Sequence, residues 1–242
     1  MKWMRKLPSN NGMFKKKVMK RILILLFITV CHHGVTAQNT YDTSYITTYY
    51  QQKLTLFRLL PDTKNEIIFL GNSITDIGEW AEIWQNKNVK NRGISGDNTF
   101  GVLARLDEVL SSKPAKIFIM IGINDISKEI PDSVIISNYK KIISRTRQQS
   151  PLTKLYVQSI LPTNNEFTEF KRHQDKDEHI RLVNTALQQI CQSQKIEFID
   201  LYHHFLDGAG KLDKQYTNDG LHINGFGYLK WKQVLIEKGC MK

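Results

Sequence analysis

Residues 67–75 read Ile-Ile-Phe-Leu-Gly-Asn-Ser-Ile-Thr, four apolar residues followed at once by glycine, asparagine and serine. A short run of β-branched and aromatic residues that ends at a glycine is typical of a buried strand. Ser73 therefore lies directly after the carboxyl end of an expected strand. Ligands bind beyond that end of the strands in open α/β sheets. This stretch thus predicts a core strand with a reactive hydroxyl beside it.

Further apolar runs of strand length alternate with amphipathic stretches of helix length. The expected strands span residues 67–70, 89–92, 117–121, 155–159 and 196–200. The expected helices lie near residues 76–87, 99–111, 133–149, 178–194 and 225–238, with an additional one within 40–60. Strands separated by helices indicate a parallel sheet covered on both faces. The prediction is an α/β fold: one three-layer α/β/α domain around a five-stranded parallel sheet, flavodoxin-like in type.

Three more segments bring polar groups to the edge where Ser73 is expected. Gly96 follows the second expected strand, and Asn124 follows the third. Asp219 and His222 lie just before the last expected helix. Because the carboxyl ends of parallel strands meet at one edge of a sheet, we expect these five residues to lie close together.

Ser73, His222 and Asp219 have the chemistry of a catalytic triad. A serine hydroxyl is a poor nucleophile until a base takes its proton, and His222 is the candidate base. Asp219 would hold the imidazole in one tautomer and stabilise its protonated form. The alternative is that Asp-Gly is a turn and His222 a surface residue. That alternative would be preferred if the other segments were absent.

Three groups are candidate donors to an oxyanion: the backbone N–H of Ser73, the backbone N–H of Gly96 and the side-chain amide of Asn124. Preorganised donors of this kind each contribute roughly 2.7–4 kcal/mol in the transition state. The alternatives are an ordinary loop glycine at 96 and a turn or helix-cap role for Asn124. Asp125 is expected to cap a helix, and Asp97, Asn98 and Thr99 to start one.

The order and spacing of four segments resemble the SGNH (GDSL-like) hydrolase family of serine esterases and acylhydrolases. The segments are Gly71-Asn72-Ser73-Ile74-Thr75, Gly93-Ile94-Ser95-Gly96-Asp97, Gly122-Ile123-Asn124-Asp125 and Asp219-Gly220-Leu221-His222. The resemblance runs from about Glu66 to the C-terminal helix and implies the SGNH hydrolase fold. It also implies the roles of the five residues: Ser73 as nucleophile, Gly96 and Asn124 as oxyanion donors, and Asp219 with His222 completing the triad.

The first segment departs from the family pattern, which is often Gly-Asp-Ser-Leu. Asn72 stands in place of the acid, and Ile74 in place of the leucine. Neither change removes a catalytic group, so the hydrolase interpretation is kept. Within the family, the chain is most similar to the compact subgroup of platelet-activating-factor acetylhydrolase-like subunits and bacterial carbohydrate acetylesterases.

Residues 1–37 have the composition of a signal peptide. A cationic segment precedes a ten-residue apolar run over 22–31, too short to span a bilayer comfortably. Val35-Thr36-Ala37 supplies small residues, so cleavage between Ala37 and Gln38 would release residues 38–242 as one exported domain. The alternatives are an uncleaved anchor and a lipid-modified Cys31. Translation starts at Met1 or at Met13.

The signal segment also accounts for most of the positive charge. The net charge is +11, and residues 1–37 hold eight Lys or Arg and no acid, so the mature chain is near +3. The high pI therefore gives no support for nucleic-acid binding. Cys191 and Cys240 remain in the mature chain, either as a disulfide or as two free thiols.

The expected function is an exported serine esterase that removes short acyl groups, acetyl above all, from carbohydrate, without a cofactor or a metal. The polar loop over residues 162–177, of a length typical of functional rims, favours a hydroxylated small-molecule or glycan ester. We expect no membrane span in the mature form. The sequence does not indicate the oligomeric state.

Other interpretations of the chain remain open at this point. A lysophospholipase or thioesterase would need an apolar acyl channel. A catalytically silent binding protein could use the same fold. A flavodoxin-like cofactor module would need a glycine-rich phosphate loop, which Gly71-Asn72-Ser73 does not supply. The His203-His204 pair is interpreted as solvated instead of metal-binding, and Trp80 and Trp84 as core residues or a sugar-stacking wall.

Overall fold

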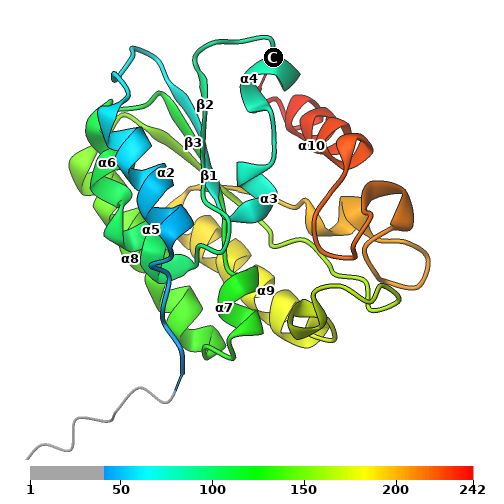
Figure 1. The fold of residues 1–242 in the computed structure, drawn as a ribbon. Helices are drawn as coiled ribbons and strands as arrows, with labels where there is room; N and C mark the ends of the chain where they lie inside the picture. The colour runs from blue at the N-terminus through cyan, green and yellow to red at the C-terminus, as the bar shows by residue number, and fades with distance from the viewer. Residues whose placement is uncertain (1–40, 242) are drawn as a thin grey trace, which may run out of the picture. The chain divides into compact units, whose positions relative to one another are not determined.

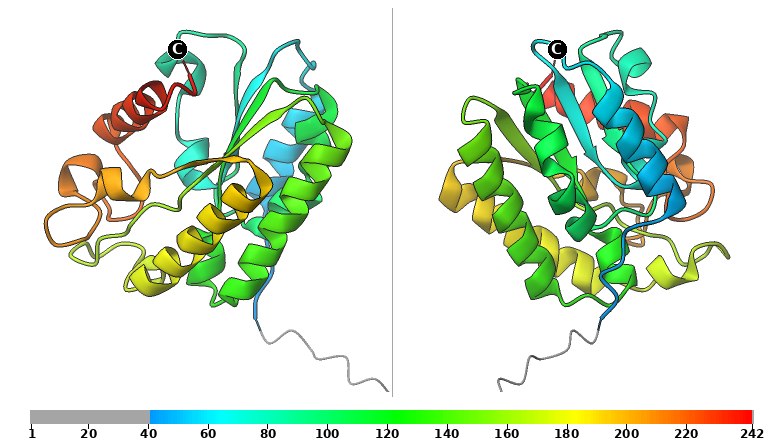
Figure 2. Two further views of the ribbon diagram at one scale, coloured as in Figure 1. Left: turned by 180° about the vertical axis from the view of Figure 1, so that it is seen from behind. Right: turned by 60° about the vertical axis from the view of Figure 1, so that its left-hand side comes forward.

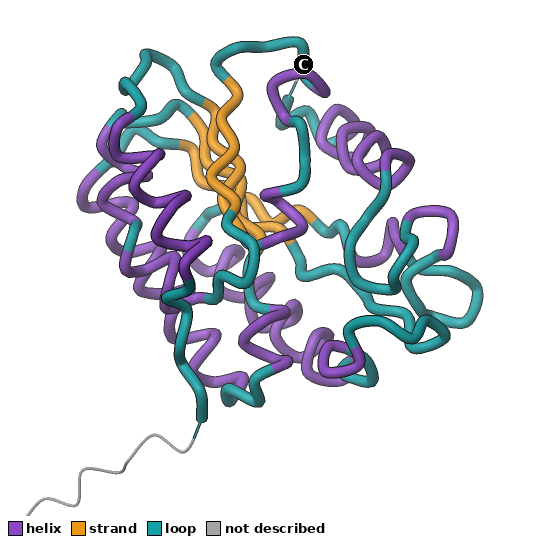
Figure 3. The backbone as a smooth tube through the Cα atoms, viewed as in Figure 1, coloured by secondary structure: helices purple, strands orange, loops and turns teal. Residues whose placement is uncertain are grey.

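A parallel sheet of five strands forms the centre of the fold. Figures 1 and 3 show this sheet between layers of helices. The computed structural model describes residues 41–241. The strands are β1 (Ile67–Gly71), β2 (Val89–Gly93), β3 (Lys116–Met120), β4 (Lys154–Gln158) and β5 (Glu197–Ile199), in the order β2-β1-β3-β4-β5. Every neighbouring pair is parallel. The predicted three-layer α/β architecture with a five-stranded parallel sheet is confirmed.

Helices cover both faces of the sheet. On one face lie α2 (Thr48–Leu59), α5 (Thr99–Ala104), α6 (Leu106–Ser111), α8 (Asp132–Gln149) and α9 (Asp177–Gln194). On the other lie α3 (Ser73–Asp76), α4 (Trp80–Ile83) and α10 (Gly225–Glu237), as the two views of Figure 2 show together. The remaining elements are α7 (Ile123–Ser127) and the 3-10 turns η2 (Lys171–His173), η3 (Tyr202–Phe205) and η4 (Lys214–Tyr216).

The register of the sheet aligns the ends of the strands that carry the site. Gly71 at the end of β1 pairs with Gly93 at the end of β2 and with Met120 at the end of β3. The three loops that follow these strands therefore leave the sheet side by side. Burial on both faces explains why the inner strands β1 and β3 are nearly continuous apolar runs in the sequence, whereas the edge strand β2 contains Lys90, Asn91 and Arg92.

Two of the expected helices are interrupted. Instead of one helix over 76–87, the chain forms α3 and α4 on either side of Gly78. Between them, the Trp80 indole N–H donates to the Thr75 carbonyl at 2.7 Å, and its ring stacks on Phe69 with 3.9 Å between centroids. The helix expected over 99–111 is broken into α5 and α6 at Arg105, whose φ and ψ are −110° and 9°.

Trp80, Trp84 and the two cysteines are all part of the interior. Trp80 is 1% exposed and Trp84 is 8% exposed, so both tryptophans serve core packing and neither forms a sugar-stacking wall. Cys191 and Cys240 are buried free thiols, which decides against a disulfide between them. Within residues 41–241, no helix has the length and hydropathy that a membrane span requires. The expectations for the signal peptide, its cleavage site and Cys31 fall outside the described residues.

Candidate active site

Ser73 is the first residue of α3, immediately beyond the carboxyl end of β1. The Asn72 side chain caps this helix by accepting a hydrogen bond from the Ile74 N–H at 3.1 Å. Asparagine therefore supplies the capping oxygen at the position where the family often has aspartate. A side chain at Gly71 would lie 2.4 Å from the Met120 carbonyl oxygen, so the strand turns into the helix only with glycine there.

His222 and Asp219 complete a chain of hydrogen bonds that starts at Ser73. The Nε2 atom of His222 lies 2.9 Å from the Ser73 Oγ, and its Nδ1 atom lies 2.7 Å from an Asp219 carboxylate oxygen. The other Asp219 oxygen accepts the N–H groups of Leu221 and His222, at 2.9 and 2.8 Å. Gly220, with φ of 81°, makes the tight turn between the acid and the histidine.

The environment of Asp219 favours its ionised form. Burial alone would raise the pKa of Asp219, but hydrogen bonds from the Leu221 N–H and from the His222 ring and N–H outweigh that effect and lower the pKa. A carboxylate in this position accepts the Nδ1–H of His222, which leaves Nε2 free to accept a proton from the serine. Ser73, His222 and Asp219 thus form one continuous chain of hydrogen bonds.

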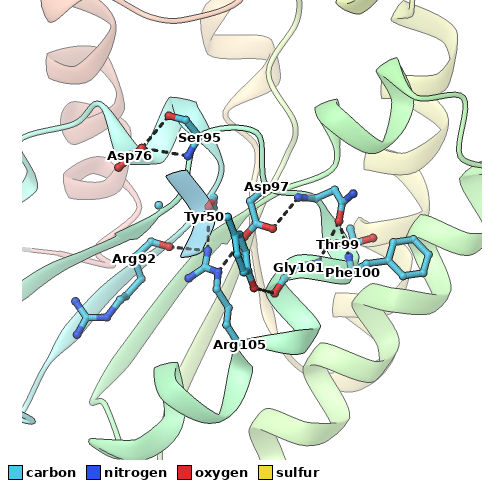
Figure 4. Close-up of polar contacts among 12 residues, drawn as sticks. Tyr50, Asp76, Arg92, Ser95, Asp97, Thr99, Phe100, Gly101 and Arg105 are labelled. Carbon is cyan, nitrogen blue, oxygen red and sulfur yellow. Dashed lines mark hydrogen bonds and ion pairs between the residues drawn. The ribbon is translucent and has the colours of Figure 1, made fainter. Parts of the chain in front are cut away.

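Gly96 lies in the loop after β2, where a network of hydrogen bonds holds the preceding residue. The Asp76 carboxylate accepts from both the N–H of Ser95, at 3.1 Å, and its hydroxyl, at 2.8 Å (Figure 4). Lys53 of α2 pairs with the other Asp76 oxygen at 2.7 Å. Gly96 itself is exposed and has φ of 81°, a conformation that favours glycine. Its backbone is therefore open to a ligand at a fixed place.

A buried ion pair ties this loop to the strands beneath it. Arg105 Nε donates to an Asp97 oxygen at 2.9 Å, and both side chains are fully buried (Figure 4). The same guanidinium donates to the carbonyls of Gly71 and Arg92, at the ends of β1 and β2. Burial raises the pKa of Asp97, and Arg105 opposes that shift. The contacts of Arg105 explain the break between α5 and α6.

Asn124 lies in α7, the short helix that follows β3. Its Nδ2 donates to the Asp97 carbonyl at 2.8 Å, which places the side chain next to the Gly96 loop. The predicted helix start after that loop is confirmed, because the Asn98 side chain caps α5 by accepting from the N–H groups of Phe100 and Gly101.

Asp125 is buried and has a capping role, but at a neighbouring helix. It accepts the N–H of Thr99, the first residue of α5, and the Thr99 hydroxyl at 2.5 Å. Its own helix α7 has no side-chain cap. Burial raises the pKa of Asp125 to about 7. The acid therefore links α7 to α5 beneath Asn124.

Two residues of the loop after β4 border the site, and the sequence did not single them out. The Phe170 ring meets the His222 ring edge-on, with 4.8 Å between centroids, and its backbone is left-handed with φ of 52°. His173 Nε2 lies 2.9 Å from the Asn124 Oδ1. The length and polarity of residues 162–177 marked this loop as a rim, but no spacing distinguished these two side chains within it.

The histidine pair at 203–204 lies apart from these residues. His203 is exposed and its Nδ1 contacts the Asp200 carboxylate at 2.5 Å. Over residues 41–241, no three His, Cys, Asp or Glu side chains gather as a metal site would require.

The chain is similar to known proteins in both sequence and fold. The model of the GDSL-like Lipase/Acylhydrolase family matches residues 69–230. A solved structure from Streptococcus pneumonia that carries the name platelet activating factor superposes with a TM-score of 0.73 and 28% identity, covering 91% of this chain and 98% of that one.

Two curated relatives are similar over most of the chain. Platelet-activating factor acetylhydrolase IB subunit alpha2 of Rattus norvegicus is 25% identical over 70% of this chain and 73% of its own length. N-acylneuraminate cytidylyltransferase of Escherichia coli is 28% identical over 73% of this chain, which spans 41% of that enzyme. The family match covers most of the sequence and contains all five residues of the predicted site. The chain belongs to the GDSL-like lipase/acylhydrolase family and is a carboxylic ester hydrolase.

Proposed function

We propose that the protein hydrolyses short-chain acyl esters with Ser73 as the nucleophile. The observation that carries this proposal is the continuous hydrogen-bond chain from the Ser73 hydroxyl through both nitrogens of His222 to Asp219, with distances of 2.9 and 2.7 Å. A hydroxyl whose proton is already shared with an oriented base is the arrangement that acyl transfer needs.

The reaction would proceed in two steps through an acyl-enzyme. The Ser73 oxygen attacks the ester carbonyl while His222 Nε2 takes the serine proton, and the carbonyl oxygen becomes an oxyanion. When the intermediate collapses, the bond to the alcohol oxygen breaks and His222 returns the proton to that oxygen. Water then repeats the sequence on the acyl-enzyme, releasing the acid and restoring the serine. Donors from Ser73, Gly96 and Asn124 would stabilise both oxyanions.

We further propose that the acyl group is acetyl, carried on an exported carbohydrate. Export rests on the signal-like composition of residues 1–37. A polar substrate is supported by the composition of the loop over 162–177, which is rich in Asn, Asp and Thr and which borders the site through Phe170 and His173. The acetyl part is supported by the relative that is an acetylhydrolase by name. The sugar part is supported by the relative named for an N-acylneuraminate, of which this chain spans 41%.

An apolar groove supports a second candidate, a lysophospholipase or thioesterase. A cavity of about 670 Å³ lies between the end of α3, α4 and α10, lined by Ile77, Phe226 and Leu229 among others. Asn218, which precedes the triad acid, also lines it. A long acyl chain in this groove would bury apolar surface, at up to about 0.8 kcal/mol for each methylene.

The length dependence of p-nitrophenyl ester hydrolysis separates the two candidates. For an acetylesterase, kcat/KM for the acetate should at least equal that for the butyrate and far exceed that for the octanoate. Acetate release from a panel of acetylated glycans would then identify the alcohol part. A kcat/KM that climbs from acetate to octanoate would favour the lipid candidate, and no hydrolysis of any ester would favour a silent binding protein.

A variant of the groove gives the matching control. Leu229 is 59% exposed on α10, so Leu229→Ser should leave the fold intact. If the groove binds no acyl chain, this substitution should change kcat/KM for the acetate and for the octanoate by the same factor. A loss confined to octanoate would place the acyl chain in the groove.

A further inference from the structure

The loop between β4 and α9 contacts both sides of the proposed site. At its start, the Asn164 N–H donates to the Gly220 carbonyl at 2.8 Å, inside the turn that carries Asp219 and His222. Near its end, His173 of the 3-10 turn η2 contacts the side chain of Asn124. The buried Gln174 side chain braces the loop by donating to two carbonyls within it, those of Phe167 and Glu169. His173 is therefore held in place by a braced segment.

The hydrogen bonds of Asn124 fix which end of its amide faces which neighbour. The Asp97 carbonyl can only accept, so the atom facing it at 2.8 Å must be the amide nitrogen. The amide oxygen then faces His173 Nε2 at 2.9 Å. Because that oxygen can only accept, His173 Nε2 must carry the hydrogen. Donor and acceptor rules alone thus assign the tautomer of His173.

His173 retains this role as a neutral donor over the working range of an esterase. Burial lowers the pKa of His173 to about 4, and the charges of His222 and Arg172 act in the same direction. Since its pKa is lowered, His173 is neutral above about pH 5 and takes up a proton only in stronger acid. It does not compete with His222 for a proton during the reaction.

An amide held at both ends presents its remaining hydrogen in one direction. Asn124 Nδ2 has two hydrogens, and Asp97 accepts one of them. The second is free for a ligand, and its direction depends on the rotation of the side chain. Without a donor on the Oδ1 side, that rotation would be held by the Asp97 bond alone.

We propose that His173 is a positioning residue for the oxyanion hole: it donates its Nε2–H to Asn124 Oδ1 and so directs the free Nδ2 hydrogen at the substrate carbonyl oxygen. The inference rests on the proposed function, because it assumes that Asn124 is an oxyanion donor. In this role His173 acts through Asn124, with which its Nε2 atom is hydrogen-bonded, and takes no direct part in the reaction.

Two amide substitutions at one position test this role. In His173→Gln, the longer side chain can place an N–H close to the position of the imidazole Nε2. In His173→Asn, the amide is too short to reach Asn124. We expect His173→Asn to lower kcat for p-nitrophenyl acetate by up to about 100-fold, the typical cost of misplacing a catalytic group. KM should change little, and His173→Gln should recover most of kcat.

The control is His179→Asn. His179 is exposed on α9 and its ring contacts Asp132 outside the site. This variant should keep the wild-type kcat. Thermal denaturation of all three variants shows whether each is folded. If His173→Asn does not fold, the kcat of His173→Gln decides, and a large loss in a folded His173→Gln would overturn the proposal.

A double-mutant cycle separates positioning from packing. If His173 acts through Asn124, adding His173→Asn to Asn124→Ala should cause no further loss of kcat. Additive losses, a loss that falls on KM, or equal kcat in wild type and His173→Asn would each overturn the inference. The proposed function itself fails if Ser73→Ala remains active or if the wild type hydrolyses no ester. Neither result depends on His173, so the two failures are distinguishable.

Discussion

His222 Nε2 and Ser73 Oγ lie 2.9 Å apart although 149 residues separate them in the chain. Helix α10 brings them together, because its Tyr228 hydroxyl donates to the carbonyl of Ile74, the residue after the serine, at 2.7 Å. The Thr217 hydroxyl donates to the His222 carbonyl at 2.7 Å and fixes the turn that precedes α10. Ser73 and His222 are therefore held by two segments that are hydrogen-bonded to each other.

Activity should fall in acid, because a protonated His222 cannot accept the serine proton. Histidine changes charge between about pH 5 and 8, whereas hydrogen bonds keep the pKa of Asp219 below its ordinary value of 3.8 despite burial. Asp219 stays ionised throughout that interval. We expect kcat/KM for p-nitrophenyl acetate to rise with pH as His222 loses its proton. A flat profile, measured where the protein is folded, would exclude His222 as the base.

Replacing Asn124 with alanine should reduce kcat and leave KM nearly unchanged. An oxyanion donor stabilises the transition state more than the bound substrate, and its removal typically costs about 10²–10³ in kcat. Steady-state kinetics with p-nitrophenyl acetate measures both constants. A variant defective mainly in KM would assign Asn124 to substrate binding instead.

Arg105→Met should destabilise the fold, because it leaves the Asp97 carboxylate buried without its partner. Breaking a buried ion pair in this way typically costs about 3–5 kcal/mol of unfolding free energy. Arg145→Met is the matched control, since Arg145 pairs with an Asp107 that is 72% exposed, and exposed pairs contribute at most about 1 kcal/mol. Urea denaturation compares the two variants. Similar losses in both would mean that the Asp97–Arg105 pair has no special role.

The strands were predictable from the sequence because both faces of a parallel sheet are buried. The inner strands β1 and β3 are then nearly unbroken apolar runs, whereas the edge strand β2 contains Lys90, Asn91 and Arg92. The end of each strand is marked by the residues that turn the chain. The position of Ser73 after β1 follows from this pattern alone. The pattern also predicts that the loops after β2 and β3 leave the sheet at the same edge as Ser73, because the carboxyl ends of parallel strands lie at one edge.

The interruptions within helices were not predictable, because they depend on distant contacts. Arg105 resembles a polar residue on an amphipathic helix, yet its guanidinium binds Asp97 and two strand-end carbonyls. Likewise, His173 is one histidine in a polar loop, and its contact with Asn124 spans 49 residues. No local spacing encodes such pairs, since only the folded loop brings them together.

The identity of the nucleophile is tested most directly by covalent labelling with a fluorophosphonate, which reacts with activated serine hydroxyls. We expect a single adduct, located on Ser73 by peptide mass spectrometry and absent from Ser73→Ala. The kcat of that variant should also be lower than that of the wild type by a factor on the order of 10⁴–10⁶. Ser95→Ala should still be labelled, because the Ser95 hydroxyl donates to the Asp76 carboxylate, whereas His222 Nε2 contacts the Ser73 hydroxyl. An adduct on another residue, or rapid ester hydrolysis by folded Ser73→Ala, would contradict the account.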